Sequence, residues 1–321
     1  MSDIIPRVDD LVLVTGGAGF IGSHLVERLL REGGRVRVLD NFSTGTRAML
    51  PFAPQYGKEL EVIEGDIRDL ADVERAAAGA RLIFHQAAMR SVPRSVHDPL
   101  GANDNNVNGT LHVLQAARTA RVARVVYASS SSVYGASPEL PKREEQRPSP
   151  ISPYAVSKAA GEQYAAVWNR LYGVETVGLR YFNVFGPRQD PASEYAAVIP
   201  RFIRWALAGE PLEVHGDGTQ SRDFTYIDNV VEANFLAARA PQAAGEVFNV
   251  GCGERISLLA IIEILERSLG RALHRRHTPT RAGDVAHTLA DIGKATRLLA
   301  YRPQVAFEEG LRRTLEYFRG G

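Results

Sequence analysis

The stretch Thr15-Gly-Gly-Ala-Gly-Phe-Ile-Gly22 follows the apolar run 11–14 directly and opens an amphipathic helix. Each of its three regularly spaced glycines has a separate task in a dinucleotide-binding loop. Gly16 makes the tight turn, Gly19 lets the backbone approach a pyrophosphate, and Gly22 allows close packing of the helix on the strand. The spacing is GxxGxxG rather than GxGxxG. The stretch predicts a strand, a phosphate-binding turn and a helix.

An acidic residue directly follows the next apolar strand, which is expected at 35–39. Asp40 follows Gly22 by 18 residues, where its carboxylate can accept both adenosine ribose hydroxyls. An acid here also repels a 2′-phosphate, so NAD is favoured over NADP. Arg37 and Arg47 are evidence against this preference, but both are more simply interpreted as charges that face solvent.

Outward from the loop, short apolar runs alternate with helical periodicity as far as residue 179. Further strands are expected at 61–63, 81–84, 124–128 and 174–179, and helices at 71–78, 109–120 and 154–172. This alternation predicts an α/β protein with a Rossmann-type, doubly wound parallel sheet and helices on both faces.

Beyond residue 180 the alternation of strand and helix signals becomes less regular. Helices are expected at 198–208 and 258–269, but the strands between them are short, and Gly and Pro are frequent. We therefore expect a nucleotide-binding domain over 1–180 and a smaller α/β substrate-binding lobe that takes up most of 181–321. The strand signal at 245–250 is compatible with a return to the first sheet.

The composition restricts the class of protein. With 45% hydrophobic and 23% charged residues, the 321-residue chain can bury a core and is not disordered. Lys plus Arg (38) nearly cancel Asp plus Glu (37), so no overall field favours nucleic acid or an anionic membrane.

A lone Cys252 excludes an intrachain disulfide and a multi-thiolate metal site. Residues 1–10 lack the apolar core of a secretory signal, and no run approaches the roughly 20 apolar residues of a membrane span. A cytoplasmic protein without a metal is expected.

Three side chains suggest catalysis at the carboxyl edge of the predicted sheet, where such sheets bind ligands. Tyr154 and Lys158 are four residues apart on a predicted helix, and Ser130 ends the fifth strand. Beside an ammonium and an oxidised nicotinamide, the pKa of a tyrosine falls, so that its phenolate can take a proton from a substrate hydroxyl. Each residue alone has a structural explanation, but together with the glycine loop they favour catalysis.

Several motifs in this order resemble extended short-chain dehydrogenases/reductases, specifically the NAD-dependent UDP-hexose 4-epimerases, over nearly the whole chain. The motifs are the glycine stretch 15–22, His85-Gln-Ala-Ala88, Ser129-Ser-Ser-Ser-Val-Tyr-Gly135, Tyr154-Ala-Val-Ser-Lys158 and Arg180-Tyr-Phe-Asn-Val-Phe-Gly-Pro187.

The resemblance implies an NAD site. Asp66 and Ile67 would hold the adenine, Ala87 and Ala88 would line the pyrophosphate, Lys158 would also bind the nicotinamide ribose, and Tyr181 would lie near the nicotinamide. From the sequence alone, Asp66 can equally be a loop or helix-capping residue. The full implied set is Gly16, Gly19, Phe20, Ile21, Gly22, Asp40, Asn41, Asp66, Ile67, Ala87, Ala88, Lys158 and Tyr181.

The resemblance also implies a UDP-sugar site. Asn183, Arg222, Arg281 and Asp284 match positions that grip the diphosphate and the uridine, although surface ion pairs are the alternative for both arginines. Thr288 matches a gate that is large in enzymes confined to plain hexoses and small in those that admit a C2 N-acetyl group. The alternative interpretation of Thr288 is a strand residue that never contacts the substrate. The implied substrate set is Ser130, Tyr154, Asn183, Arg222, Arg281, Asp284 and Thr288.

The implied reaction is inversion at C4 of a UDP-sugar through a 4-keto intermediate, in a homodimer. Related dehydratases usually carry Asp-Glu where this chain has Ser131 and Ser132, and related decarboxylases carry Glu at the latter position. Those two reactions are the alternatives, and a dinucleotide sensor without chemistry is a weaker one. The sugar is left open among plain hexoses, N-acetylhexosamines and uronic acids, with Ser91, Arg94 and Arg188 as further residues that could select it.

Overall fold

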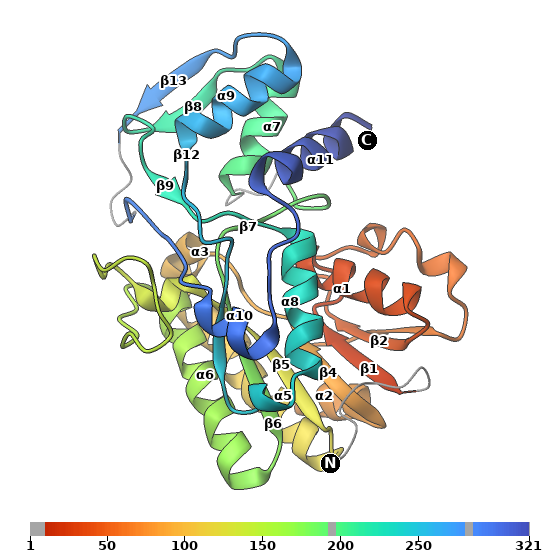
Figure 1. Cartoon of the computed structure of the whole chain (residues 1–321). Coiled ribbons are helices and arrows are strands. Elements are labelled where there is room, and N and C mark those ends of the chain that lie inside the picture. Colours follow the sequence, from red (N-terminus) through yellow and green to blue (C-terminus); the bar gives the residue numbers. More distant parts are fainter. Residues whose placement is uncertain (1–9, 192–196, 280–284, 321) are drawn as a thin grey trace.

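The computed structural model describes residues 10–191, 197–279 and 285–320 (Figure 1). Its centre is a seven-stranded sheet with the order β11-β6-β5-β4-β1-β2-β3, in which all neighbours are parallel. The strands are β1 (Leu11–Thr15), β2 (Arg35–Asp40), β3 (Leu60–Glu64), β4 (Ala80–His85), β5 (Arg124–Ser130), β6 (Glu175–Tyr181) and β11 (Val247–Val250). The strand order reverses between β1 and β4, which opens a crevice at their carboxyl ends. The predicted doubly wound α/β fold is confirmed.

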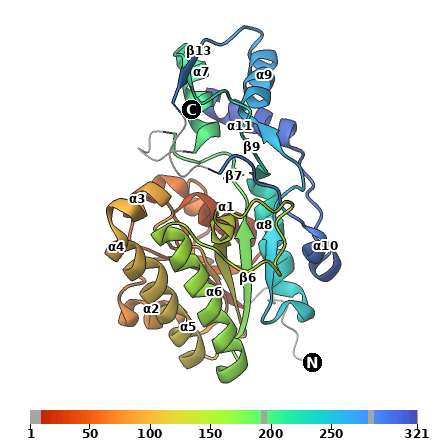
Figure 2. The ribbon, with the colours of Figure 1, turned by 90° about the vertical axis from the view of Figure 1, so that its left-hand side faces the viewer.

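Helices cover both faces of this sheet. Figure 1 shows α1 (Phe20–Arg31) and α8 (Ile227–Arg239) together on one face, and Figure 2 shows α2 (Leu70–Ala77), α5 (Gly109–Thr119) and α6 (Pro153–Tyr172) along the other. Successive side chains of a strand point to opposite faces. Val12 and Val14 accordingly join the larger apolar cluster with α1 and α8, while Leu13 joins the cluster with α2 and α5. Burial on both faces explains why the strands are almost wholly apolar.

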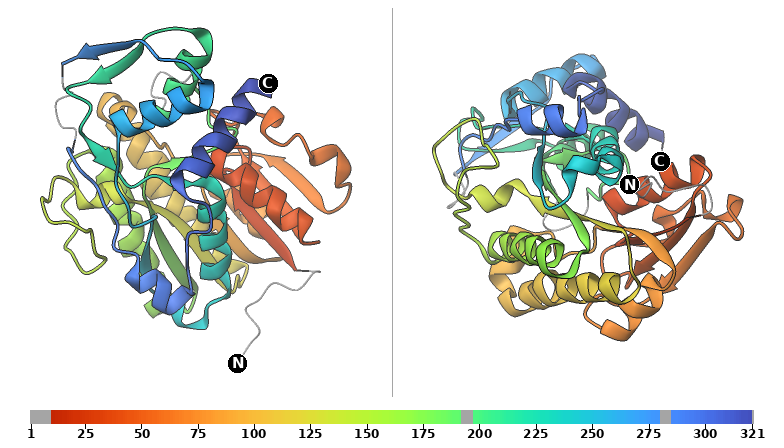
Figure 3. Two further views of the ribbon diagram at one scale, coloured as in Figure 1. Left: turned by 45° about the horizontal axis from the view of Figure 1, so that its top comes forward. Right: turned by 60° about the horizontal axis from the view of Figure 1, so that its bottom comes forward.

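A smaller lobe lies over one end of the sheet, as the two views of Figure 3 show. Its helices are α7 (Val198–Ala208), α9 (Leu258–Leu269) and α11 (Phe307–Gly320). Its strands pair as β7 (Val184–Phe185) with β10 (Thr225–Tyr226), β8 (Leu212–His215) with β13 (Arg275–Thr278), and β9 (Ser221–Arg222) with β12 (Ile256–Ser257). The segment expected to be a strand at 245–250 forms β11, the edge of the large sheet.

Several helices were not expected from the sequence. Helices α8 and α11 are two of them. The others are α3 (Val92–His97), α4 (Pro99–Asn103), α10 (Gly293–Leu299) and the 3-10 turns η1 (Arg47–Met49), η2 (Ala53–Gln55), η4 (Ser131–Tyr134) and η5 (Pro241–Ala243). A π-helical turn, η3 (Asp104–Asn108), joins α4 to α5, which begins at Gly109 as expected. Helix α8 is buried on most of its circumference and therefore lacks a clear apolar stripe.

The carboxyl end of α8 is fixed to the sheet by Arg124, whose side chain is fully buried. One guanidinium nitrogen donates to the carbonyls of Ala237 (2.7 Å) and Ala240 (2.8 Å), and another binds Glu175 at 2.6 Å. The carbonyls of the last helical turn have no partner within a helix, so the arginine satisfies them.

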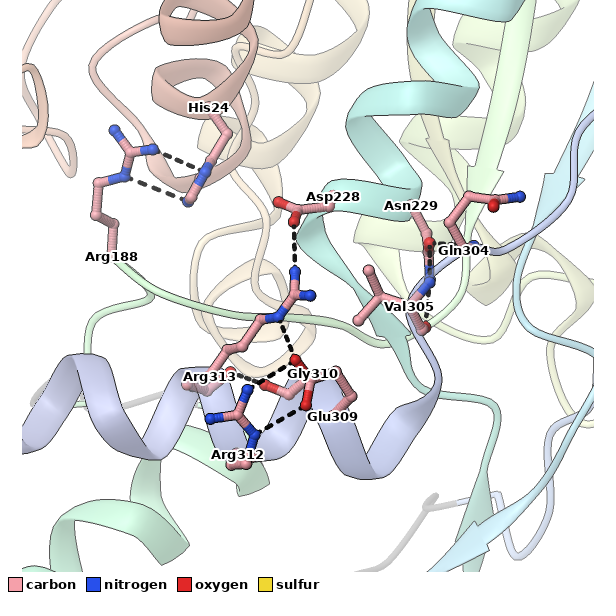
Figure 4. A network of polar contacts seen from close by, with 11 residues as sticks. His24, Arg188, Asp228, Asn229, Gln304, Val305, Glu309, Gly310, Arg312 and Arg313 are labelled. Carbon is pink, nitrogen blue, oxygen red and sulfur yellow. Dashed lines mark hydrogen bonds and ion pairs between the residues drawn. The ribbon is translucent and has the colours of Figure 1, made fainter.

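The other end of α8 contacts the small lobe. Figure 4 shows Asp228 facing Arg313 of α11, with 3.4 Å between carboxylate and guanidinium. Next to it, the Asn229 amide oxygen accepts from the backbone N–H groups of Gln304 (2.8 Å) and Val305 (3.0 Å), and its nitrogen donates to the Val305 carbonyl (2.8 Å). The segment that enters α11 is thus held against α8.

Every helix within the described ranges is too short or too polar to cross a bilayer. The cytoplasmic location expected from the sequence stays a prediction.

Candidate active site

The glycine loop can only be built with glycine. Gly16 has a φ of +69°, and a Cβ there would lie 2.7 Å from the Ala87 backbone nitrogen. A Cβ on Gly22 would lie 2.1 Å from the Gly16 carbonyl oxygen, so α1 could not approach the turn. Gly19 occupies the N-cap position of α1. The first amides of this helix are thereby left for a ligand, as in an anion site.

These loop residues line a pocket that runs along the carboxyl edge of the sheet. Residues that were predicted for the cofactor and that line this pocket are Gly16, Gly19, Phe20, Ile21, Gly22, Asp40, Asn41, Ile67, Ala87, Ala88, Lys158 and Tyr181. The pocket also holds Ser130, Tyr154 and Asn183 from the predicted substrate set.

Asp40 ends β2 beside the glycine loop and is almost buried. Its carboxylate accepts from the backbone N–H of Ala18 and of Phe42, both at 2.9 Å. Burial raises the pKa of this carboxyl, and the two amide donors oppose that rise. The acid therefore has a fixed position at the site where a ribose is expected.

The two arginines that argued against NAD are already paired. Arg37 donates to Glu61 at 2.7 Å and to two carbonyls at the end of α2. Arg47 binds Glu64 at 3.1 Å and lies over the Phe42 ring. Both contacts agree with the simpler interpretation, in which neither guanidinium serves a 2′-phosphate.

Asp66 differs from its predicted neighbours because its carboxylate is occupied. Arg68 donates to it at 2.7 and 3.0 Å, and the Asn41 amide donates at 2.8 Å. The Arg68 hydrogen bonds lower the pKa of the Asp66 carboxyl to about 2. Gly65 and Ile67 line the pocket, whereas Asp66 is not among its described lining residues. A contact with adenine stays a prediction.

The structure brings the three predicted catalytic side chains together. Ser130 is the last residue of β5, and Tyr154 and Lys158 lie one turn apart at the start of α6. The α6 N-terminus is fixed by Ser152, whose hydroxyl accepts from the Ala155 amide at 3.2 Å. The Lys158 ammonium lies 6.0 Å from the centre of the Tyr154 ring.

The lowered pKa expected for Tyr154 depends on a bound oxidised nicotinamide, and the protein groups by themselves act in the opposite direction. Burial raises the pKa of Tyr154, while a hydrogen bond from Ser130 and the charge of Arg90 oppose this rise. Burial also lowers the pKa of Lys158 to about 7, against a rise caused by Glu162. The protein groups alone therefore do not lower the pKa of Tyr154.

Tyr181 is held by a small polar cluster at the switch point of the sheet. Its hydroxyl accepts from the side-chain amides of Asn234 (2.9 Å) and Gln86 (3.1 Å). Burial raises the pKa of Tyr181 to about 12, so the phenol stays protonated. Sequence reasoning did not single out Gln86, Asn234 or Arg90, although Gln86 lies inside a quoted motif.

The predicted substrate residues are only partly assembled. Asn183 lines the pocket, and its amide donates to the Asp223 carbonyl (3.0 Å) and to the Thr288 hydroxyl (3.4 Å). Arg222 donates to the carbonyls of Ser221 and Ala286, both at 3.0 Å, and is not among the described lining residues. Arg281 and Asp284 lie outside the described residues.

Of the three further candidates for sugar selection, only Arg188 lines the pocket, and its guanidinium is engaged elsewhere. It binds His24 at 2.7 Å and Glu27 at 2.5 Å on α1 (Figure 4 shows the contact with His24). Ser91 caps α3 by accepting from the Arg94 amide at 3.2 Å, and Arg94 is exposed.

Comparisons with known proteins agree with one another over most of the chain. A model of the family described as "NAD dependent epimerase/dehydratase family" matches residues 12–251. The UDP-glucose 4-epimerase of Mycolicibacterium smegmatis is 41% identical, over 96% of this chain and 98% of that protein. The UDP-glucuronate 4-epimerase of Thermodesulfobacterium geofontis is 36% identical, over 95% of each. Among solved structures, a UDP-N-acetylglucosamine 4-epimerase from Methanobrevibacter ruminantium has a TM-score of 0.92 and 40% identity, covering 97% of this chain and 99% of that one.

We predict that Asp40→Ala lowers the affinity for NAD by about tenfold to a hundredfold, because the charged ribose acceptor is lost. The affinity for NADP should fall less or rise, since the repulsion of a 2′-phosphate is lost too. Calorimetric titration with each dinucleotide measures both, and Glu59→Ala, which removes an exposed carboxylate that is not among the described lining residues, is the control. An unchanged NAD/NADP ratio in Asp40→Ala would contradict the assigned role.

Proposed function

The chain belongs to the NAD dependent epimerase/dehydratase family, and from that premise we propose that it inverts C4 of a UDP-sugar. NAD is its cofactor, as predicted. The observation that carries the proposal is that Ser130, Tyr154 and Lys158 face the same pocket as the glycine loop and Asp40. A sensor that performs no chemistry would have no use for this triad.

The pocket fits the cofactor in several respects. The close approach of Gly16 to Ala87 leaves no room for a Cβ at residue 16, so only the bare backbone of the turn lies beside the pocket, and the α1 N-terminus suits a diphosphate. Asp40 would hold the adenosine ribose, Ala87 and Ala88 the pyrophosphate, and Lys158 the nicotinamide ribose. The chemistry that bound NAD would supply is reversible hydride transfer at the sugar carbon.

The chain's own residues would move the proton. Tyr154 accepts the proton of the C4 hydroxyl, and Ser130 shares the hydrogen bond that orients this hydroxyl. The Lys158 ammonium favours the phenolate electrostatically. After the 4-keto sugar has turned within the pocket, Tyr154 returns the proton and C4 is inverted without net oxidation.

Dehydration, the other reaction in the family description, is less well supported. It needs an acid and a base beside the catalytic hydroxyl, and here Ser131 and Ser132 follow Ser130. Ser132 accepts a hydrogen bond from the Ser130 hydroxyl at 3.1 Å. Among the described lining residues the carboxylates are Asp40, on the cofactor side, and Asp190. Neither belongs to the serine segment that would supply the acid–base pair.

The choice of sugar depends on the wall near Asn183. Thr288 contacts this pocket residue through the 3.4 Å hydrogen bond, so it lies next to the pocket lining. A threonine leaves more room than a tyrosine. We therefore infer that the pocket admits a C2 N-acetyl group.

A homodimer is proposed from an apolar face on α3, α4 and α6, which pack together. Val156, Tyr164 and Leu171 lie within one side of α6, and Val96 and Leu100 of the neighbouring helices are 63% and 82% exposed. Exposed apolar patches of this kind mark association surfaces. A second copy of this chain is the proposed partner, and α6 would then lie at the interface and carry the catalytic residues.

We predict that Tyr154→Phe folds and retains NAD but loses roughly 10²–10⁴-fold in turnover, because the ring still packs while the proton acceptor is gone. The assay incubates the protein with UDP-glucose, UDP-N-acetylglucosamine and UDP-glucuronate and separates the C4 epimers. Tyr172→Phe, at the far end of the same helix, should be as active as the wild type. A Tyr154→Phe enzyme of near-normal rate would refute the mechanism, and a product of changed mass would refute epimerisation.

We predict that Thr288→Tyr reduces turnover of UDP-N-acetylglucosamine about tenfold or more relative to UDP-glucose, because the larger ring clashes only with the larger sugar. Thr288→Ser, which keeps the space, should leave the ratio unchanged. Equal losses on both sugars in Thr288→Tyr would show that residue 288 does not select at C2.

We predict that the protein sediments with twice the mass of its 35.1 kDa chain and that Leu100→Glu shifts it toward the monomer, because a carboxylate would be buried at the apolar face. Tyr317→Glu, at an exposed apolar residue of α11, is the control and should stay dimeric. A wild-type monomer at micromolar concentration would reject this interface.

A further inference from the structure

A fully buried ion pair lies directly behind the catalytic residues. Glu162 of α6 and Arg180 of β6 are each 4% exposed. The Arg180 guanidinium donates to both carboxylate oxygens, at 2.9 and 2.8 Å, which is the bidentate geometry. Neither side chain is among the described residues that line the pocket, so the pair lies behind the pocket wall.

The pair connects the elements that carry the catalytic groups. Glu162 continues the helical face of Tyr154 and Lys158, one turn further on. The hydroxyl of Ser129, the residue before Ser130, donates to the Glu162 carboxylate at 2.5 Å. Arg180 directly precedes Tyr181 on the neighbouring strand. One carboxylate therefore sets the distance from α6 to the ends of both strands.

The remaining polar atoms of the pair are satisfied from outside. Arg180 donates to the Tyr134 hydroxyl at 2.9 Å, which donates in turn to the Asn249 side chain at 2.6 Å. The Asn249 backbone N–H donates to Glu144 at 2.7 Å. These hydrogen bonds connect the pair to β11. Because its polar groups are hydrogen-bonded in this way, the Glu162–Arg180 pair keeps a single geometry.

The stability of the fold does not explain the pair. Two apolar residues of similar size often stabilise a core as well as a buried ion pair or better, because desolvation of the charges is costly. The distinctive property of the pair is its location beside Lys158, whose ammonium donates to the Ala128 carbonyl at 2.8 Å.

We propose that Glu162, held by Arg180, is a positioning residue of the active site: it fixes Ser130 against the helix that carries Tyr154, and its negative charge keeps the Lys158 ammonium protonated. The inference rests on the proposed function, because it assigns these two tasks to the reaction described above.

The groups that face Lys158 support this role. Tyr127 of β5 places its ring 5.1 Å from the ammonium, His85 faces it from β4, and Tyr154 and Glu162 face it from its own helix. Burial lowers the pKa of His85 to about 3 and raises that of Tyr127, so both are neutral near pH 7. Glu162 is thus the one anion among these described neighbours. Around the Glu162–Arg180 pair itself lie Tyr134 and Glu144.

The sign of the effect follows from the charges. Burial lowers the pKa of the Lys158 ammonium and the charge of Glu162 raises it, and with both effects the pKa is about 7. Glu162→Gln removes the anion and leaves the Arg180 cation, so Lys158 should lose its proton at lower pH. Activity and NAD binding, which both need the ammonium, should then fail earlier on the alkaline side.

The test measures the NAD dissociation constant from weakly acidic to alkaline pH, which requires no turnover, and the alkaline limb of kcat/KM where epimerisation is observed. In Glu162→Gln both inflections should move to lower pH by about one unit, a tenfold change in the protonation equilibrium. In Glu162→Asp, which keeps the charge but shortens the side chain, the inflections should stay in place while kcat falls. Inflections that overlay the wild type in Glu162→Gln would overturn the inference.

A second variant guards against a simple loss of folding. Glu162→Gln combined with Arg180→Met removes both charges, so it should restore the stability lost in the single variant. Its inflection should remain below that of the wild type, because the anion is still missing; an inflection at the wild-type pH would refute the role. A wild-type protein that binds NAD but epimerises no UDP-sugar would refute the proposed function, while the NAD titration would still test the pair.

Discussion

The close approach of two backbones at the switch point of the sheet is the constraint on which the rest of the structure depends. The turn after β1 and the turn after β4 meet where Gly16 faces Ala87, and the backbone N–H of Gln86 donates to the Thr15 carbonyl at 3.1 Å. A side chain at residue 16 would push the turns apart. The pocket, its glycine loop and the Ala87–Ala88 wall all follow from this contact, since a parallel sheet opens its crevice only where the strand order reverses.

The first half of the fold could be predicted because its signals are local and repeated. Strands buried on both faces give unbroken apolar runs, and the helices between them show a clear period, so every strand expected up to residue 179 is present. Helix α8 was missed because burial on most sides removes the period, and two-residue strands such as β7 and β9 are too short to show one. In the small lobe, tertiary contacts decide the structure.

For the candidate site, the sequence predicted the positions of the catalytic side chains but not the ion pairs around them. Ser130, Tyr154 and Lys158 lie where their spacing placed them, because strand ends and helical turns fix geometry. The pairing of Asp66 with Arg68 and of Arg188 with His24 and Glu27 was not predictable, since several partners are possible for each charge along the chain. Burial depth, which sets the pKa of Tyr154 and Lys158, depends on the assembled sheet and helices. The spacing of Glu162, four residues after Lys158, could have placed it on the catalytic face of α6. Its pairing with Arg180 could not be predicted, because Arg180 belongs to another motif.

The position of β11 has a consequence for the nascent chain. The first six strands of the sheet are complete once residue 181 has been synthesised, but their neighbour β11 begins only at Val247. Until then, the outer side of β6 is an open strand edge whose N–H and C=O groups can pair with another chain. The arrival of β11 closes this edge and lets Asn249 join Tyr134 and Glu144 behind the catalytic helix. The open edge of β6 therefore persists while α7 and α8 are synthesised, and it is closed before α9 and α11 of the small lobe have been made.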